Sequence, residues 1–253
     1  NNGLQVFGTI TKSAVATGAE LVGYSGWSAS NYLMRPYNDS TEDPGSGDWS
    51  FISWAKTSTS HTGILWSIRD PNNSTPFLQV WFNGTNFSAG QNPGGYIITP
   101  LSYADDFWHC YVVTKRNGTI DLYFDGIKKA SIIANSDPGL PTTSQFRVGN
   151  HYNNDHPVQG DMALMRYSLS TPSPEQIKKI YEDEKVLFQE NAACTLYGTS
   201  DAVTALAYDN STSLLHVGTS SGRSEFKGLR RINNTTTAIT TAISAYDSFV
   251  AEQ

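Results

Sequence analysis

The polar segment from residue 150 to residue 161 carries the residue types best suited to chemistry. It reads NHYNNDHPVQGD. Aromatic rings can stack on the face of a pyranose, while amide and imidazole groups can hydrogen-bond to its hydroxyls. Both kinds of group are supplied here, by His151, Tyr152, Asn153 and His156. These residues predict a carbohydrate-binding site, and the alternative is a polar surface loop. Other aromatic residues could serve equally or belong to the core: Trp27, Tyr32, Tyr37 and Tyr96.

Catalysis by a nucleophile or by zinc finds little support in the residue pattern. His109 and His216 lie inside predicted strands, where a packing role is expected, and Cys110 points to the opposite sheet face from His109. Neither Cys-x-x-Cys nor His-x-x-x-His occurs, which argues against zinc. The glycine-rich stretch at 218–222 lacks the lysine of a phosphate-binding loop. We therefore predict no catalytic residue.

Composition and charge exclude two classes of partner. The 253 residues carry a net charge of −6 and no Lys/Arg-rich run, whereas nucleic-acid binding depends on basic side chains that displace counterions. No apolar run approaches the roughly 18 to 20 residues needed to cross a bilayer. We expect neither nucleic-acid binding nor membrane insertion. The first residues lack the features of a signal peptide, and the absence of an initial Met indicates a piece of a longer protein.

The two cysteines carry little information. Cys110 lies in a predicted strand and Cys194 in a connector, so the simpler interpretation is two small buried hydrophobes. A disulfide between them stays open, because sequence does not place their Cα atoms within bonding range.

The elements that must position these residues are mostly short strands. The stretch 107–133 combines strand-forming residues with two tight-turn signals, Asn117-Gly118 and Asp125-Gly126, and predicts a three-stranded meander. Further strand patterns recur about every 8 to 14 residues with turn residues between them, which is typical of a β-sandwich or barrel. The sequence predicts an all-β fold.

One helix interrupts the strands, and the end of the chain differs in character. Ser173-Pro174-Glu175-Gln176 has a cap residue, a proline at the first helical position and a capping-box Gln, so a helix should start here and lie against the sandwich. Residues 191–253 offer a hairpin and one further strand. Such a segment has too few strands for a core of its own. We expect it to pack on the sandwich or on copies of itself.

The order of these pieces resembles the concanavalin A-like or laminin-G-like jelly-roll family over residues 19–190. The matching stretches are DWSFISWAK at 48–56, the meander at 107–131, FRVGN at 146–150, GDMALMRYSLS at 160–170 and PEQIKKIYEDE at 174–184. This resemblance implies an antiparallel β-sandwich with one short helix at its C-terminal end. The expected organisation is an N-terminal connector or strand (1–18), the jelly roll (19–190) and an additional β segment (191–253).

The resemblance also brings two functions of the family into question for this chain, calcium binding and glycoside hydrolysis. Many members of the family bind calcium at the sandwich rim, and Asn154, Asp155 and Asp161 offer the hard oxygen ligands that calcium prefers. Glycosidases of this fold carry acidic residues alternating on one strand, as in E-x-D-x-x-E. No such pattern occurs in the sequence. Calcium is therefore retained as a hypothesis, and a non-enzyme is expected.

The flanks of the sandwich narrow the resemblance. Residues 15–38 and 201–232 are similar to laminin-G-containing tail or virion structural proteins of bacteriophages. That similarity implies a virion protein that is commonly oligomeric, exposed on the particle and often concerned with host attachment. Together with the segment 191–253, which is expected to need a partner surface, it predicts a homotrimer that contacts other virion proteins and attaches to a cell-surface glycan of the host. The alternatives are a cement protein with a purely structural role and a carbohydrate-active enzyme module.

Overall fold

The computed structural model confirms the predicted antiparallel β-sandwich. It describes residues 3–38, 42–73, 75–101, 103–193, 195–199, 202–228 and 230–253. Cys194 lies outside the described residues, so its pairing stays open, and Cys110 is buried. The chain divides into two compact units, the first comprising Asn1–Ser13 and Gly23–Tyr181, the second Ala14–Val22 and Glu182–Gln253. In the described part of the chain, no helix has the length and apolarity to cross a membrane.

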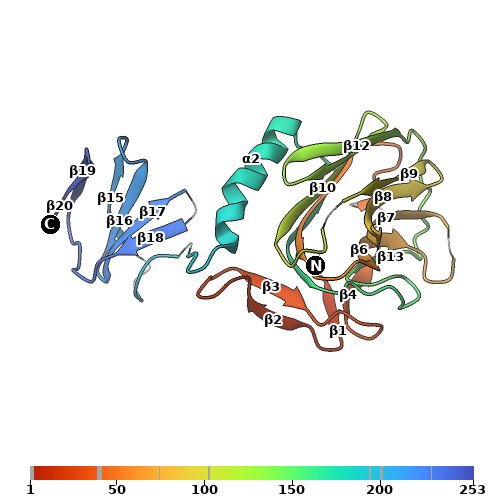
Figure 1. Cartoon of the computed structure of the whole chain (residues 1–253), viewed down its shortest axis with the longest axis horizontal. Coiled ribbons are helices and arrows are strands. Elements are labelled where there is room, and N and C mark those ends of the chain that lie inside the picture. Colours follow the sequence, from red (N-terminus) through yellow and green to blue (C-terminus); the bar gives the residue numbers. More distant parts are fainter. Residues whose placement is uncertain are drawn as a thin grey trace. The chain divides into compact units, whose positions relative to one another are not determined.

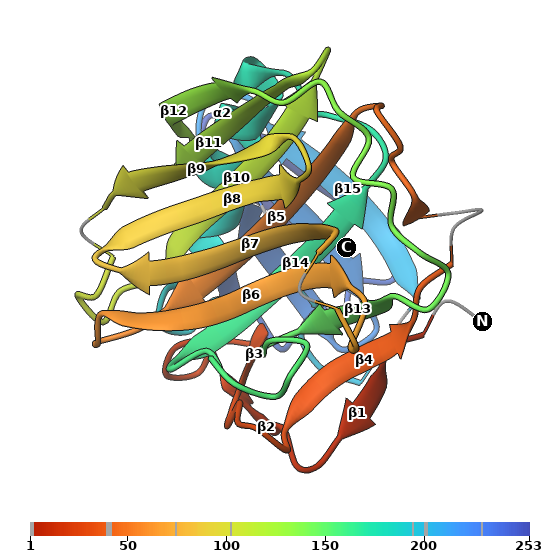
Figure 2. The same ribbon diagram turned by 90° about the vertical axis from the view of Figure 1, so that its right-hand side faces the viewer.

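Two seven-stranded sheets form the sandwich (Figures 1 and 2). The first sheet has the order β1 (Gln5–Phe7), β4 (Tyr32–Pro36), β13 (Gln145–Val148), β6 (His61–Arg69), β7 (Phe77–Gly84), β8 (Asn86–Asn92), β9 (Gly95–Pro100). The second sheet has the order β12 (Ile127–Ile133), β11 (Thr119–Phe124), β10 (His109–Arg116), β5 (Trp49–Lys56), β14 (Asp161–Ser168), β3 (Val22–Ser25), β2 (Thr11–Ala14). The first sheet faces the viewer in Figure 2.

The meander forms as predicted, because its two turns have the backbone conformation that their sequences favour. Asn117 and Gly118 have φ of 48° and 72°, and Asp125 and Gly126 have φ of 51° and 75°. Positive φ at both central residues is the requirement of a type I′ turn. The turns place β11 antiparallel to β10 and β12 antiparallel to β11.

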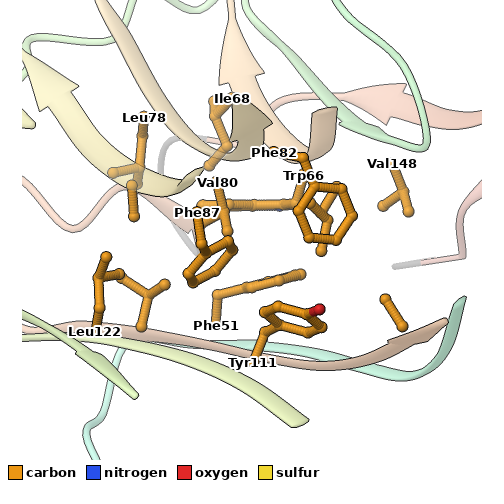
Figure 3. Close-up of a cluster of buried hydrophobic side chains, with 14 of the residues drawn as sticks. Phe51, Trp66, Ile68, Leu78, Val80, Phe82, Phe87, Tyr111, Leu122 and Val148 are labelled. Carbon is orange, nitrogen blue, oxygen red and sulfur yellow. The ribbon is translucent and has the colours of Figure 1, made fainter. Parts of the chain in front are cut away.

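Aromatic and aliphatic side chains fill the space between the sheets (Figure 3). The first sheet contributes Trp66, Ile68, Leu78, Val80, Phe82, Phe87 and Val148, and the second contributes Phe51, Tyr111 and Leu122. Phe82 stacks on Tyr103 at 4.4 Å, and Trp66 lies 4.8 Å from Tyr167. Trp27 and Tyr37 are buried and belong to this core. The core interpretation is therefore confirmed for these two aromatic residues.

The predicted helix is α2 (Pro174–Glu184), followed by the 3₁₀ turn η1 (Lys185–Phe188). Its capping box is complete, because the Gln176 N–H donates to Ser173 Oγ at 3.2 Å and the Ser173 N–H donates to Gln176 Oε1 at 2.7 Å. Tyr181 stacks on Trp54 of β5 at 5.8 Å. The helix thus covers the second sheet on the side away from the core.

Residues 1–18, expected as a connector or strand, contain the two strands β1 and β2. Gly8, with φ of 65°, lies between them. β1 pairs with β4, and β2 is the last strand of the second sheet. The expected organisation into residues 1–18, 19–190 and 191–253 stays a prediction.

The second unit has more strands than the sequence indicates. β15 (Val203–Asp209), β16 (Leu214–Thr219), β17 (Gly222–Lys227) and β18 (Arg230–Asn234) form a four-stranded sheet, and β19 (Ile243–Tyr246) and β20 (Phe249–Glu252) form a hairpin. Ala205, Ile239 and Ile243 make a small core of its own. The expectation of three strands without a core is therefore wrong.

An early segment of the chain belongs to this second unit. Within it, the Asn191 N–H donates to the Thr17 carbonyl at 2.8 Å, and the Glu20 N–H donates to the Ala192 carbonyl at 2.8 Å. The Glu20 carboxylate accepts from the Thr195 N–H at 3.0 Å and from its hydroxyl at 2.6 Å. Residues 14–22 and 191–195 are therefore joined by both backbone and side-chain bonds.

Candidate functional site

The predicted sugar-binding residues lie in the connection between β13 and β14, residues 149–160, which we call the rim loop. Asn154 and His156 have φ of 65° and 50°, so the loop turns sharply twice. The His151 N–H donates to the Asp155 carbonyl at 3.0 Å, and the Ile64 N–H donates to the His156 carbonyl at 3.0 Å. The first bond closes the turn, and the second ties the loop to β6.

The rim loop brings four of the predicted residues into one cluster around the Asp155 carboxylate. Oδ1 lies 2.7 Å from His151 Nδ1 and 2.6 Å from His156 Nδ1. Asn153 Nδ2 donates to Oδ2 at 2.9 Å. Burial raises the pKa of Asp155, but hydrogen bonds from His156, Asn153 and His151 outweigh it and the net shift is downward. Asp155 is therefore an ionised acceptor that orients both imidazoles.

Arg69 stands under this cluster, and sequence analysis did not single it out. It is the last residue of β6, and its Nη1 donates to His151 Nε2 at 2.9 Å. Its guanidinium lies between two aromatic rings, 4.2 Å from Tyr152 and 4.9 Å from Phe77. These cation–π contacts fix the Tyr152 ring on the sheet. The missed signal is strand alternation, since Ile68 points into the core and Arg69 must point outward.

His151 is held in one tautomer by these neighbours. Because Arg69 can only donate, Nε2 must accept, and the proton sits on Nδ1 facing Asp155. Burial lowers the pKa of His151, although hydrogen bonds to Asp155 and Asn153 oppose the shift. His151 is thus a neutral link between a cation and a carboxylate.

Arg147 supports the other side of the rim loop. It points outward from β13, since Phe146 and Val148 are in the core. Its guanidinium lies 4.6 Å from the ring of Tyr32, which itself stacks on Phe7 at 4.9 Å. The stack covers the outer face of the first sheet, meaning the face turned away from the second sheet.

A second aromatic pair lies farther along this outer face. Trp81 of β7 and Tyr96 of β9 have ring centroids 5.9 Å apart, and Tyr96 is 49% exposed. β8 runs between them, and its residues Ser88 and Gly90, which pair with Trp81 and Tyr96, are small and buried. Tyr32 and Tyr96, two of the alternative aromatic residues, are therefore on the same sheet face as Arg69 and Arg147.

The three residues predicted for calcium each contact other protein groups. Asn154 Oδ1 accepts from Arg147 Nη1 at 2.7 Å, and the Asp155 oxygens accept from the loop. Asp161 lies 3.8 Å from Lys56 Nζ in the strand pairing of β14 with β5. The oxygens of Asn154, Asp155 and Asp161 are thus engaged by protein groups, and calcium binding by these residues stays a prediction.

A different set of side chains could hold a metal by distance alone. The ligand atoms of His151, Asp155 and His156 lie within 4.8 Å of one another. A metal on His151 Nδ1 would put the proton on Nε2, where it would face the donor Nη1 of Arg69 at 2.9 Å. These residues therefore do not fit a transition metal in this arrangement.

His109 is engaged by carboxylates on both sides. Nδ1 lies 2.7 Å from Asp125 Oδ2, and Nε2 lies 3.1 Å from both oxygens of Asp105. Both ring nitrogens are occupied, so neither faces a hydroxyl or thiol nucleophile. This geometry gives His109 a structural role.

Comparisons with known proteins agree on the sandwich. A model of the family Laminin_G_3, the concanavalin A-like lectin/glucanases superfamily, matches residues 28–178. A search of curated proteins gave no match.

Solved structures show the same likeness of fold. Domain 4 of AbnA, a GH43 extracellular arabinanase from Geobacillus stearothermophilus in complex with arabinotriose, is 16% identical with a TM-score of 0.52, over 69% of this chain and 82% of that one. The binding domain of paraclostridial mosquitocidal protein 1 is 11% identical with a TM-score of 0.57, over 86% and 59%. The binding domain of botulinum neurotoxin serotype G is 10% identical with a TM-score of 0.55, over 93% and 59%. The match thus spans less than two thirds of either toxin binding domain.

Proposed function

The chain belongs to the concanavalin A-like lectin/glucanases superfamily, and we propose that its sandwich binds carbohydrate without cleaving it. The observation that carries the proposal is the cluster on the rim loop. There an aromatic ring and several hydrogen-bonding groups stand together at the outer face of the first sheet.

Tyr152 is the proposed stacking platform. Arg69 covers one face of its ring at 4.2 Å, and the residue is partly exposed. A pyranose would stack on the opposite face, where its C–H groups meet the π system. Beside it, His156 is exposed, and with Nδ1 committed to Asp155 its Nε2 can bond to a sugar hydroxyl. A ring held by a buried cation loses little freedom on binding, which favours affinity.

The similar structures are compatible with a binding module. One is a domain of an arabinanase in complex with arabinotriose, and two are binding domains of toxins. The absence of paired acids on one strand in the sequence supports binding without hydrolysis.

The proposed setting is the virion of a bacteriophage, where the chain would attach the particle to a host-surface glycan as a homotrimer. This part rests on the similarity of residues 15–38 and 201–232 to phage tail and virion proteins. The exposed apolar side chains of the second unit are compatible with contacts between copies; they include Leu206, Tyr208, Tyr246 and Phe249. Sedimentation equilibrium tests the trimer, and a stable folded monomer would refute it.

A glycan array tests the binding itself. The wild-type chain should bind a defined set of glycans, and Tyr152→Ala should weaken binding about two- to tenfold, since an aromatic contact contributes about 0.5–1.5 kcal/mol. The matched control is Phe107→Ala, an exposed aromatic residue just before β10 to which no role in binding or assembly is assigned and which should leave binding unchanged.

Four results would contradict the proposal. The wild-type chain could bind no glycan, or Phe107→Ala could weaken binding as much as Tyr152→Ala. Release of sugar from a bound polysaccharide would refute the non-enzymatic part. Particles that adsorb normally without the chain but become fragile would indicate a cement protein.

A further inference from the structure

Arg147 sits in a cage of oxygen atoms. Its Nη1 donates to Asn154 Oδ1 at 2.7 Å and to the His151 carbonyl at 2.9 Å, and lies 3.4 Å from Asn150 Oδ1. On its other side, Nε donates to Gln145 Oε1 at 2.8 Å. Amide and carbonyl oxygens converging on one point are the ligand type of a hard cation such as calcium. Here the cationic centre is a side chain.

The groups bonded to the Arg147 guanidinium are neutral amide and carbonyl oxygens. Arg147 is only 5% exposed, and no carboxylate among the residues the structure describes forms an ion pair with it. Burial lowers the pKa of Arg147, as expected for a charge removed from water. Its charge is therefore solvated by oxygen dipoles and the Tyr32 ring, as that of a bound ion would be.

The cage determines the shape of the rim loop. The three acceptors come from its first half, residues 150–154, which contains the left-handed residue Asn154. Asn150 is fully buried and its Nδ2 donates to the Ser28 carbonyl at 3.2 Å, so the loop is also fixed from below. Arg69 also fixes the imidazole of His151, because its Nη1 donates to His151 Nε2 at 2.9 Å. The guanidinium groups of Arg69 and Arg147 thus hold the loop through hydrogen bonds.

We propose that Arg147 takes the place of a bound metal ion in the rim loop. The loop then keeps its ligand-binding shape without a divalent cation, and removing the guanidinium opens an oxygen cage that can accept calcium. It follows that sugar binding is independent of divalent cations, and this consequence rests on the proposed function. The order of the rim loop without a metal ion is a separate consequence that does not rest on it.

Amide hydrogen exchange over residues 151–156 is the test. In the wild-type chain, neither a chelator nor about 1 mM calcium should change the exchange rates. Arg147→Met should accelerate exchange about tenfold or more, because it removes charge-assisted hydrogen bonds. Added calcium should slow that exchange again in Arg147→Met.

The matched control is Arg116→Met at a distant position. Arg116 also makes two hydrogen bonds, to Thr171 Oγ1 at 2.9 Å and to the Thr171 carbonyl at 2.8 Å. Its removal should leave exchange at 151–156 unchanged with and without calcium. A calcium effect in this variant would overturn the assignment of the cage to Arg147.

Other results would also overturn the proposal. They are faster exchange in the wild-type loop on chelation, calcium binding by the wild-type loop in a titration, unchanged exchange in Arg147→Met, or no response of that variant to calcium. The wild-type measurements decide the matter even if Arg147→Met fails to fold. Glycan binding that a chelator abolishes would refute this proposal alone, whereas no glycan binding under any condition would refute the proposed function alone.

Discussion

His109 should make the stability of the sandwich depend on pH, and His109→Gln isolates its contribution. The imidazole lies between Asp125 at 2.7 Å and Asp105 at 3.1 Å and stacks on Phe124 at 4.6 Å. Burial lowers the pKa of His109, but the two carboxylates outweigh it and the net shift is upward. Asp125 Oδ1 also accepts from the Cys110 N–H at 2.9 Å, so the turn keeps an anchor when the imidazole is removed.

The magnitude follows from the exposure of the partners. The His109 and Asp125 side chains are 15% and 21% exposed, so their charge-assisted hydrogen bond should contribute about 1.5–3 kcal/mol. Asp105 is 42% exposed, and such a pair adds little, about 0–1 kcal/mol. Desolvation of the imidazolium offsets part of the sum. We expect a net contribution of about 1–2 kcal/mol when His109 is charged.

The sign follows from the raised pKa. The folded state binds the proton more tightly than the unfolded state, so the stabilisation is complete below the unfolded pKa of about 6.5. It is lost as pH rises through the folded pKa. Burial lowers the pKa of His61 and His151, so these two residues make the protein more stable as pH rises. Both are present in wild type and variant, so their effect cancels in the difference between the two.

Thermal unfolding followed by tryptophan fluorescence measures the difference. Below about pH 6 the wild type should unfold roughly 2–8 °C above His109→Gln, and the gap should close as pH rises. A gap that is constant with pH, or that widens toward alkaline pH, would refute the assignment of a charged His109 between two carboxylates.

Two further substitutions, Gly118→Ala and Asp209→Asn, test the turns, and Gly139→Ala is the control for the first. Gly118→Ala puts a side chain at φ of 72° where its Cβ would clash with a neighbouring side chain, and should cost about 1–3 kcal/mol in urea unfolding; Gly139→Ala, at φ of 63° in open space, should cost less. Equal losses would contradict the clash. Asp209→Asn should speed amide exchange at Ser211 and Ser248, whose N–H groups donate to this carboxylate at 2.9 and 2.8 Å, and should leave the first unit unchanged.

The sandwich was predictable because its local signals are strong. Asn-Gly and Asp-Gly at 117–118 and 125–126 specify their turns directly, and the capping box at Ser173 specifies the helix start. The hairpin of β19 and β20 in the second unit has no such sequence signal. Its turn uses Asp247 and Ser248 at φ of 48° and 69°, where glycine is absent.

The site was predictable only in part. Its loop residues stand out by composition, and the structure brings His151, Asn153, Asp155 and His156 together. Arg69 lies 82 positions before His151 in the chain, and only the pairing of β6 with β13 makes them neighbours. Contacts across strands of such long sequence separation depend on sheet order, which a single sequence does not reveal.

The joining of residues 14–22 to residues 191–195 constrains how this chain is made. During translation the early segment leaves the ribosome long before its partners are synthesised. At about 5–20 residues per second, the roughly 170 intervening residues take on the order of 10–30 s. For that period the bonds that Asn191 and Thr195 make to this segment cannot form, although the sandwich core can already be forming. A recombinant fragment that stops before residue 191 would keep the early segment in that same nascent condition permanently.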